Sequence, residues 1–182
     1  MNVIIYFLLL IVELFVLLGF SIYSVGLLFS SFKGAPYVPT SKNQLEKILE
    51  NAHLKKKSHL VELGSGDGRL VRLAVKKYGI TGVGLEINPL LVWWSNHLAR
   101  RDGTSKKVQF VRKNVFDYPL ENADFLYVFL MPELIRKLVP KFKKELKKGA
   151  IIVSHGFKIV DLQKRLVHTE YDKRFSTYYY KI

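Results

Sequence analysis

The sequence predicts an open α/β fold, a mostly parallel sheet with flanking helices, preceded by one N-terminal transmembrane helix. Two patterns lead to this prediction. Short apolar runs typical of buried strands alternate with helical segments from residue 59 to residue 154, as in parallel βαβ units. Before them, residues 3–29 form an apolar run that contains a single charged residue, Glu13. We therefore expect one membrane-spanning segment and one globular domain.

The apolar run at residues 3–29 is longer than the roughly 20 residues that a helix needs to cross the core of a bilayer. A signal peptide would begin with basic residues, whereas the start MNVIIYF has no basic side chain. Lys33, Lys42 and Lys47 follow the run, and basic flanks stay on the cytoplasmic side of a membrane. We therefore predict that residues 3–29 contact the lipid bilayer, and that the chain is a single-pass membrane protein with its domain on the cytoplasmic, or an equivalent internal, side.

The rest of the chain is long enough for one compact domain but not for two. Gly34, Pro36 and Pro39 indicate an extended linker between the apolar run and this domain. The predicted parts are a transmembrane anchor (1–31), a linker and substrate-side segment (32–40), and a globular domain (41–182).

The net charge of +14 lies almost entirely on the globular domain. Such a charge suits nucleic acid, an acidic protein or an anionic membrane surface, and it also fits a solvated basic face that has no specific partner. For a protein held at a membrane, the anionic surface is the simplest explanation. The absence of cysteine excludes a disulfide framework, which is compatible with an internal location.

The elements of the domain follow one another as alternating strands and helices. Ser41 and Gln44 resemble a capping box that begins a short helix, and Gly79 is typical of the end of the next helix, 70–78. Further helices are expected from Pro89 and Pro132, with Pro140 interrupting or restarting the last. The tail KRLVHTEY and FSTYYYKI is rich in β-formers and predicts an antiparallel hairpin. The other predicted strands are 59–63, 83–87, 108–111, 123–130 and 150–154.

A glycine-rich turn follows the first predicted strand, in the sequence VELGSGDGRLV. It lacks the Lys-Ser or Lys-Thr of a phosphate-binding loop, and Arg69 stands where the dinucleotide motif needs its third glycine. Its three glycines let the backbone pass close to a ligand, while Glu62 and Asp67 add negative charge. Carboxylates would repel a pyrophosphate, so the turn suits a ligand that presents an ammonium group and a sulfonium.

Two more polar residues follow neighbouring strands. Glu86 ends the second predicted strand, where a carboxylate can accept hydrogen bonds from both hydroxyls of an adenosine ribose. Asn114 follows the third, where its amide can bind adenine, although a turn-forming asparagine is the other interpretation. Because ligands of open α/β sheets bind across the carboxyl ends of the strands, the sequence predicts S-adenosyl-L-methionine as the cofactor.

Several segments together resemble the seven-strand protein-lysine methyltransferases. They are PYVPT, ELGSGDGR, GLEIN, FLMP and LKKGAIIVSHGF, within residues 35–182. This group includes the archaeal broad-specificity protein-lysine methyltransferase and the membrane-anchored mitochondrial enzymes that modify the ATP synthase c subunit and the adenine nucleotide translocase. The resemblance implies a Rossmann-like class I methyltransferase sheet with flanking helices and an S-adenosylmethionine-dependent domain over residues 41–182.

The resemblance also implies roles for individual residues. Thr40 and the residues beside it would fold over the cofactor and help to form a lysine channel. Family members often carry Asp at the position of Asn114, which leaves cofactor affinity in question. The expected cofactor-binding residues are Glu62, Gly64, Ser65, Gly66, Asp67, Gly68, Glu86 and Asn114. The expected channel residues are Tyr37, Pro39, Met131 and Phe157, and the candidates for catalysis are Tyr37, Thr40 and His155.

The expected chemistry is an in-line displacement in which a lysine amine attacks a methyl group on sulfur. Alignment supplies most of the acceleration, and desolvation beside the sulfonium lowers the pKa of the lysine, so no strong base is needed. His155 is either a polar contact or proton acceptor in the site or a structural histidine. Trp93 and Trp94 are expected to pack against the domain, and we expect no metal.

The expected partner is a protein with an accessible lysine, associated with the membrane. Three alternatives remain open at this point. A membrane tether also suits a lipid or quinone methyltransferase, and a scaffold that binds the cofactor without turnover would keep the same loop. An RNA methyltransferase would use the basic charge, but FLMP lacks the Asn/Asp-Pro-Pro-aromatic signature that positions a base amine, so nucleic acid is not the expected partner.

Overall fold

The computed structural model describes residues 3–32 and 39–182. The chain divides into two compact units, Met1–Tyr37 and Val38–Ile182, and each is described here by itself. The first unit contains helix α1 (Val3–Phe32). Within the described residues, its segment Val3–Ile22 is long and apolar enough to cross a membrane, judged by length and composition.

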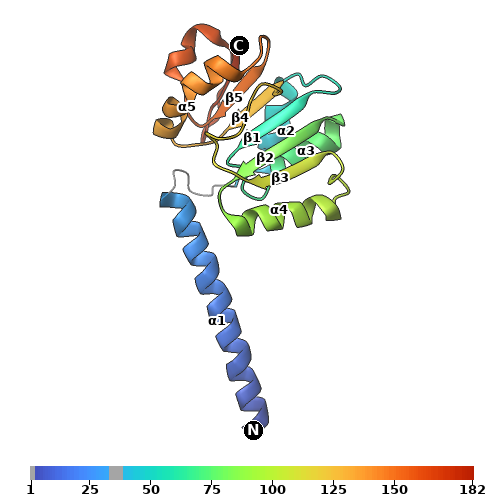
Figure 1. Cartoon of the computed structure of the whole chain (residues 1–182), viewed down its shortest axis with the longest axis vertical. Coiled ribbons are helices and arrows are strands. Elements are labelled where there is room, and N and C mark those ends of the chain that lie inside the picture. Colours follow the sequence, from blue (N-terminus) through green and yellow to red (C-terminus); the bar gives the residue numbers. More distant parts are fainter. Residues whose placement is uncertain (1–2, 33–38) are drawn as a thin grey trace. The chain divides into compact units, whose positions relative to one another are not determined.

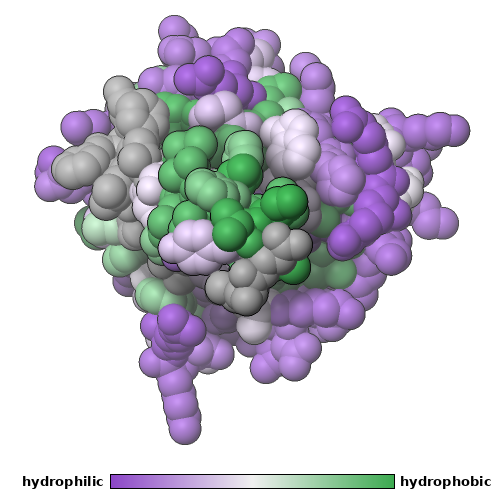
Figure 2. Space-filling model, turned by 90° about the horizontal axis from the view of Figure 1, so that it is seen from below, coloured by the Kyte–Doolittle hydropathy of each residue, from purple (hydrophilic) through white to green (hydrophobic). Residues whose placement is uncertain are grey.

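The large apolar side chains of Val3–Ile22 are exposed along the whole segment. Large apolar residues such as Phe15 and Phe20 are about two-thirds exposed. In Figure 2 the apolar side chains of Val3–Ile22 are green, whereas much of the remaining visible surface is hydrophilic. This exposure is opposite to that of a core helix in a globular protein, whose apolar face is covered.

The second unit is built on one seven-stranded sheet with the order β3-β2-β1-β4-β5-β7-β6. Five strands, β3 to β5 in that order, run parallel, and β7 runs antiparallel to both β5 and β6. The predicted α/β class, with its antiparallel C-terminal hairpin, is confirmed. The strands are β1 (His59–Leu63), β2 (Thr81–Glu86), β3 (Val108–Arg112), β4 (Phe125–Val128), β5 (Ile151–His155), β6 (Leu166–Glu170) and β7 (Thr177–Lys181).

Helices flank the sheet, as Figure 1 shows. The expected interruption of the last α-helix at Pro140 is wrong, because the helix continues through it. Pro140 and Arg136 are both exposed, so water can solvate the Arg136 carbonyl that lacks a helical partner. The helices are α2 (Lys42–Asn51), α3 (Arg69–Tyr78), α4 (Pro89–Arg101), α5 (Pro132–Glu145) and the short 3-10 helix η1 (Val160–Arg165).

Helix α2 holds the start of the domain against the core. Ser41 is its N-cap and accepts a hydrogen bond from the backbone N–H of Gln44 at 3.4 Å, as the sequence predicts. Leu49 is fully buried in the cluster that joins α2 to β1, α3 and β7, and the hydroxyl of Tyr179 donates to the Ile48 carbonyl at 3.3 Å. These contacts fix the position of the residues that precede α2.

Helix α4 corrects another expectation, because Trp93 and Trp94 do not pack into the core. Their side chains are 65% and 41% exposed. The helix instead buries Ser95, Leu98 and Ala99 on its other face. Small residues let α4 lie close to the sheet, and the two indoles remain on the side that faces away from it.

Candidate active site

The glycine turn lies between the end of β1 and the start of α3, and backbone hydrogen bonds hold it in place. The N–H groups of Gly64 and Ser65 both donate to the Leu85 carbonyl of β2, at 2.9 and 2.8 Å. Gly64, Gly66 and Gly68 have φ values of +79°, +54° and +71°. Side chains with a Cβ rarely adopt this left-handed conformation, so the turn requires its alternate glycines.

Space as well as conformation requires glycine in this turn. A Cβ at Gly68 would lie 2.2 Å from the ring of Phe110, and a Cβ at Gly64 would lie 2.9 Å from Leu130. Gly84 on β2 lies beneath the turn, where a Cβ would be 2.5 Å from Phe110 and 2.7 Å from Ser65. The backbone of the turn therefore sits directly on the sheet and leaves its outer side to a ligand.

Glu86, at the end of β2, is buried and binds three backbone donors. Its Oε1 accepts from the N–H groups of Ile87 and Asn88, at 2.8 and 2.9 Å, and its Oε2 accepts from Gly66 at 3.0 Å. These bonds tie the glycine turn to β2 and fix the carboxylate at the carboxyl edge of the sheet. Each oxygen has two lone pairs, so Oε2 can still accept a bond from a hydroxyl.

Glu62, at the end of β1, is buried without comparable support. Within the described part of the chain, its Oε2 has no hydrogen-bond partner. Burial raises the pKa of Glu62 well above its ordinary value, and the carboxylates of Asp67 and Glu86 add to the effect. A cationic group placed at this oxygen would offset both causes. The residues present thus fit a ligand with a positive charge.

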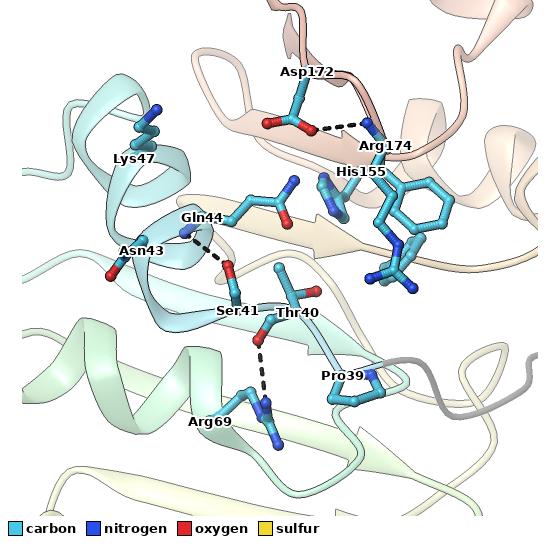
Figure 3. A pocket seen from close by; sticks show the side chains of 12 residues that line it. Pro39, Thr40, Ser41, Asn43, Gln44, Lys47, Arg69, His155, Asp172 and Arg174 are labelled. Atoms are coloured by element: carbon cyan, nitrogen blue, oxygen red, sulfur yellow. Dashed lines mark hydrogen bonds between the residues drawn. The ribbon is translucent and has the colours of Figure 1, made fainter.

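Asp67 forms an ion pair with Arg69, which the sequence analysis did not identify as part of the site. The guanidinium of Arg69 donates to both Asp67 oxygens, with distances from 2.9 to 3.1 Å. The same guanidinium donates to the Thr40 carbonyl at 3.1 Å (Figure 3). Arg69 therefore links the glycine turn to the segment before α2. The carboxylate of Asp67 holds the Arg69 guanidinium in this position through charge-assisted hydrogen bonds.

A cavity of about 410 Å³ lies next to this link. Figure 3 shows that side chains from several distant segments surround it, with the amide of Gln44 extending from α2 toward His155. The lining residues are Pro39, Thr40, Ser41, Asn43, Gln44 and Lys47 before and on α2, Arg69, Phe129 after β4, His155 at the end of β5, and Asp172, Arg174 and Phe175 between β6 and β7.

His155 combines deep burial with a ring nitrogen that has no hydrogen-bond partner in the part of the chain that the structure describes. Its Nδ1 is 2.9 Å from the hydroxyl of Thr177, while its Nε2 has no partner among the described residues. The rings of Phe129 and Phe175 stand edge-on to it, with centroids 4.7 and 5.8 Å away. Burial lowers the pKa of His155 to about 4, although Asp172 opposes the shift. The imidazole is therefore neutral at physiological pH.

Tyr127 on β4 connects the two sides of the site and was not predicted from the sequence. It is the register partner of Glu62, and its ring is stacked on His155 with centroids 6.4 Å apart. Burial raises the pKa of Tyr127 well above its ordinary value, and the Glu62 carboxylate adds to the effect. Its hydroxyl therefore remains protonated and can act only as a neutral donor or acceptor.

The structure brings together one predicted channel residue and two of the candidates for catalysis. Pro39, Thr40 and His155 all line the cavity. Met131 is 44% exposed before α5, and Phe157 follows β5 with its carbonyl accepting from the Ser154 hydroxyl at 2.6 Å; neither lines this cavity. Tyr37 lies outside the described residues. The channel roles of these last three residues stay predictions.

Asn114 lies in an exposed turn after β3. Its Oδ1 accepts from the N–H of Phe116 at 3.1 Å, and its carbonyl accepts from the N–H of Asp117 at 3.0 Å. This geometry gives Asn114 a turn-forming role, as one of the two interpretations expects. Its Nδ2 group is not used in these bonds, so a contact to adenine stays a prediction.

Comparison with known proteins shows that the chain is similar to methyltransferases. The profile of the ANTKMT methyltransferase domain matches residues 62–165. The chain is 34% identical over 122 residues to the human lysine N-methyltransferase of the ATP synthase c subunit, covering 67% of this chain and 52% of that protein. It is 33% identical over 125 residues to a protein-lysine N-methyltransferase of Saccharolobus islandicus, covering 68% of this chain and 78% of that protein.

A solved structure is also similar over most of the chain. It is an RNA methyltransferase from Salinibacter ruber in complex with S-adenosyl-L-homocysteine, with a TM-score of 0.76 and 32% sequence identity. The match covers 80% of this chain and 94% of that one. By contrast, this chain spans only about half the length of the human relative.

Proposed function

Because the chain belongs to the ANTKMT methyltransferase domain family, we propose that it is an S-adenosylmethionine-dependent methyltransferase that modifies lysine side chains of proteins. The human and the Saccharolobus islandicus relatives are both lysine N-methyltransferases. One observation carries the proposal. Within the described part of the chain, the buried Glu62 has an unpartnered oxygen, and its register partner Tyr127 stacks on His155, which lines the cavity with an unpartnered Nε2.

The residues around the glycine turn fit the parts of the cofactor. Glu62 would bind the cationic methionine end, because a positive group there relieves the penalty on its buried charge. Glu86 would accept from the ribose hydroxyls, and Asn114 would contact adenine through its side-chain amide group. Ser65 and the glycines would line the methionine part with their backbone. When bound, S-adenosylmethionine supplies an activated methyl group on a sulfonium.

The cavity would hold the lysine side chain. Phe129 and Phe175 offer apolar faces for its methylene groups and exclude water from the amine. Lys47 and Arg174 also line the cavity, where Asp172 opposes them as the only carboxylate among the described lining residues. The positive charges and the loss of water would lower the pKa of the entering lysine from about 10.4. A neutral amine then forms without a strong base.

His155 would position this amine through its Nε2. A group with a pKa of about 4 does not keep a proton at neutral pH, so we assign His155 the role of hydrogen-bond acceptor. The proton that the lysine releases passes to solvent at the mouth of the cavity. Thr40, buried between Arg69 and the cavity, would hold the segment before α2 over the site.

We further propose that α1 anchors the domain in a membrane and that the substrate is a membrane-associated protein. The length and composition of Val3–Ile22 and the exposure of its side chains support this. A tether raises the effective concentration of the domain near membrane proteins and restricts which lysines it reaches. The domain would face the cytoplasmic or an equivalent internal side, because Lys33, Lys42 and Lys47 follow the helix.

A second candidate is methylation of RNA. The similarity to the Salinibacter ruber RNA methyltransferase and the net charge of +14 favour it. The segment after β4 speaks against it, since Met131 and Pro132 stand there instead of the Asn/Asp-Pro-Pro-aromatic sequence that binds a base amine.

One experiment separates these functions. The purified full chain is incubated with methyl-tritiated S-adenosylmethionine and native membranes, and label is counted separately in protein, lipid and RNA. We expect label in protein that survives acid hydrolysis as methyl-lysine. Label confined to lipid or to RNA would replace the proposal with the corresponding methyltransferase, and binding of the cofactor without label in any fraction would favour a non-catalytic scaffold.

Variants make this assay specific to the site. Glu62→Gln should abolish the label, whereas Glu121→Gln, at an exposed carboxylate outside the site, should leave it unchanged. Deleting residues 1–33 should weaken labelling in membranes if the tether selects the substrate. Unchanged labelling after this deletion would contradict the role of the anchor but not the reaction.

A further inference from the structure

Helix α4 carries an exposed aromatic stripe, which we define as Leu90, Trp93, Trp94 and His97. These residues are spaced three and four apart and therefore share one face of the helix. His97 stacks on both indoles, with ring centroids 6.0 Å from Trp93 and 5.5 Å from Trp94. Three of the four side chains of the stripe are therefore rings that contact one another, with Leu90 beside them on the same face.

The aromatic stripe is exposed although its residues favour burial. Leu90, Trp93 and Trp94 are 42%, 65% and 41% exposed, and His97 is exposed too. Burial on α4 is confined to its other face, which packs on the sheet. A large apolar surface that is left open in this way marks a contact with a partner.

Charge at the end of the same helix identifies the kind of partner. Arg100 and Arg101 form the last turn of α4 directly after the stripe, and both are exposed. Tryptophan rings are enriched where a bilayer meets water, because one edge is polar and the rest apolar. Arginines beside them bind anionic head groups. The face as a whole has the composition of an interfacial helix.

From these observations we infer that the aromatic stripe of α4 is a second membrane contact, which seats the domain on an anionic bilayer surface. The inference rests on the membrane anchoring proposed above. The domain's share of the +14 net charge adds long-range attraction to such a surface. Seven residue steps join Phe32 to Pro39, a chain of at most about 25 Å, so a domain anchored through α1 stays within reach of the bilayer.

The tryptophans themselves provide the test, because Trp93 and Trp94 are the only two in the chain. The full chain is reconstituted into phosphatidylcholine vesicles with and without phosphatidylglycerol, containing lipids brominated close to the head group. We expect the tryptophan emission to shift to shorter wavelength and to be quenched roughly twofold in the anionic vesicles, since the indoles lie at the interface. Emission that the brominated lipids do not quench would overturn the inference.

A matched pair of charge variants tests the role of the arginines. Arg100→Glu with Arg101→Glu should reduce the quenching toward the value in neutral vesicles. The control reverses the two exposed lysines in the last turn of α5, Lys143→Glu with Lys144→Glu, which changes the net charge by the same amount. Equal losses in both variants would show general attraction and would contradict a defined surface on α4.

Two further measurements separate this inference from the proposed anchor. Alkaline carbonate extraction of the same vesicles tests whether α1 is inserted in the membrane. If the chain resists extraction but its tryptophans are not quenched, α1 is an anchor and the membrane contact of the aromatic stripe is overturned. A chain that is extracted by carbonate overturns the anchor instead. An emission shift in detergent that grows with protein concentration would assign the stripe to contact with a second copy and also overturn the inference.

Discussion

The two sides of the candidate site are built by different means. At the ends of β1 and β2, backbone hydrogen bonds and glycines hold the proposed cofactor side of the site within two short segments, 62–68 and 84–88. At the ends of β4 and β5, side chains from distant segments form the cavity through ring contacts and one link through Arg69. A backbone-built side changes only when the fold changes. A wall of side chains can vary and adapt to different substrates.

The largest expected effect tests the backbone-built side. Gly68→Ala should lower the free energy of unfolding by roughly 2–5 kcal/mol, because it adds left-handed strain and a contact at 2.2 Å with Phe110. Thermal unfolding of the full chain in detergent measures the loss, and titration with S-adenosylhomocysteine should show that binding is lost as well.

A matched variant separates strain from crowding. Gly103 has nearly the same φ, +72°, and a Cβ at this position would have nothing within 4 Å. Gly103→Ala should therefore cost only about 1–2 kcal/mol from strain. Equal losses at the two glycines would show that the ring of Phe110 moves aside and that the turn does not depend on close packing.

The second largest effect concerns the cavity wall that is built from side chains, and it is seen in how the free energy of unfolding depends on pH. Because the pKa of His155 is lowered to about 4, the unfolded chain binds more protons than the folded chain between pH 6.5 and 4. The contribution of neutral His155 to the free energy of unfolding is fully present above pH 6.5. It is lost as the pH falls to 4, and the loss is on the order of 3 kcal/mol. His155→Asn should flatten this part of the stability curve.

The control for the His155→Asn variant is a substitution of an exposed histidine, His53. His53→Asn changes a surface residue whose positive φ, 48°, suits asparagine, so its stability curve should follow that of the unaltered chain. Unfolding midpoints are compared from pH 7 to pH 4. A curve for His155→Asn with the original slope would mean that His155 is already protonated, or hydrated, in the folded protein.

The third effect compares the two buried carboxylates of the cofactor side. Glu86→Gln places an amide against the Gly66 N–H and should lower stability by about 2 kcal/mol. Glu62→Gln should not lower stability in this way, because no donor among the described residues binds Oε2 of Glu62 and would face the new amide group. Both variants should weaken binding of S-adenosylhomocysteine, measured by calorimetry.

The pH dependence distinguishes these carboxylates further. With the pKa of Glu62 raised, the folded chain binds more protons than the unfolded chain above pH 4.5, so stability falls as the pH rises through that window. Glu62→Gln should remove this fall and become more stable than the unaltered chain at neutral pH. A Glu62→Gln variant as unstable as Glu86→Gln would mean that Oε2 of Glu62 also accepts a hydrogen bond, in addition to the backbone bond that Val71 donates to this carboxylate.

The smallest expected effect is at Asn114, at the outer end of the cofactor side. Asn114→Ala should change stability by less than about 1 kcal/mol, since the turn is exposed, and should weaken cofactor binding roughly tenfold if the amide contacts adenine. Asn114→Asp keeps an acceptor for both the turn and the adenine amine and should bind more tightly than the alanine variant. Unchanged affinity in both would leave Asn114 a turn residue only.

Much of the fold could be predicted because its signals are local. The glycine turn at Gly64, Gly66 and Gly68, the helix end at Gly79 and the Ser41 cap depend on a few neighbouring residues, and the structure has each of them. The buried strands were recognisable for the same reason, although β4 forms only over Phe125–Val128, shorter than its apolar run.

The expectations that failed depended on which residues are exposed at the surface of the folded protein. Pro140 was expected to break a helix, but both it and the carbonyl it leaves without a partner are at the surface. The tryptophans of α4 were expected to pack, because indole rings favour burial and their spacing alone does not show which face meets the sheet.

The sequence by itself determined the order of the strands and helices, the conformation of the glycine turn and the placement of Glu62 and Glu86 at strand ends, because each depends on backbone geometry over a few residues. Only the tertiary structure decided that Arg69 reaches Thr40, that Tyr127 lies between Glu62 and His155, and that Phe175 lines the cavity. These contacts join segments far apart in the chain, and their burial, which sets the protonation of Glu62 and His155, exists only once the sheet has formed.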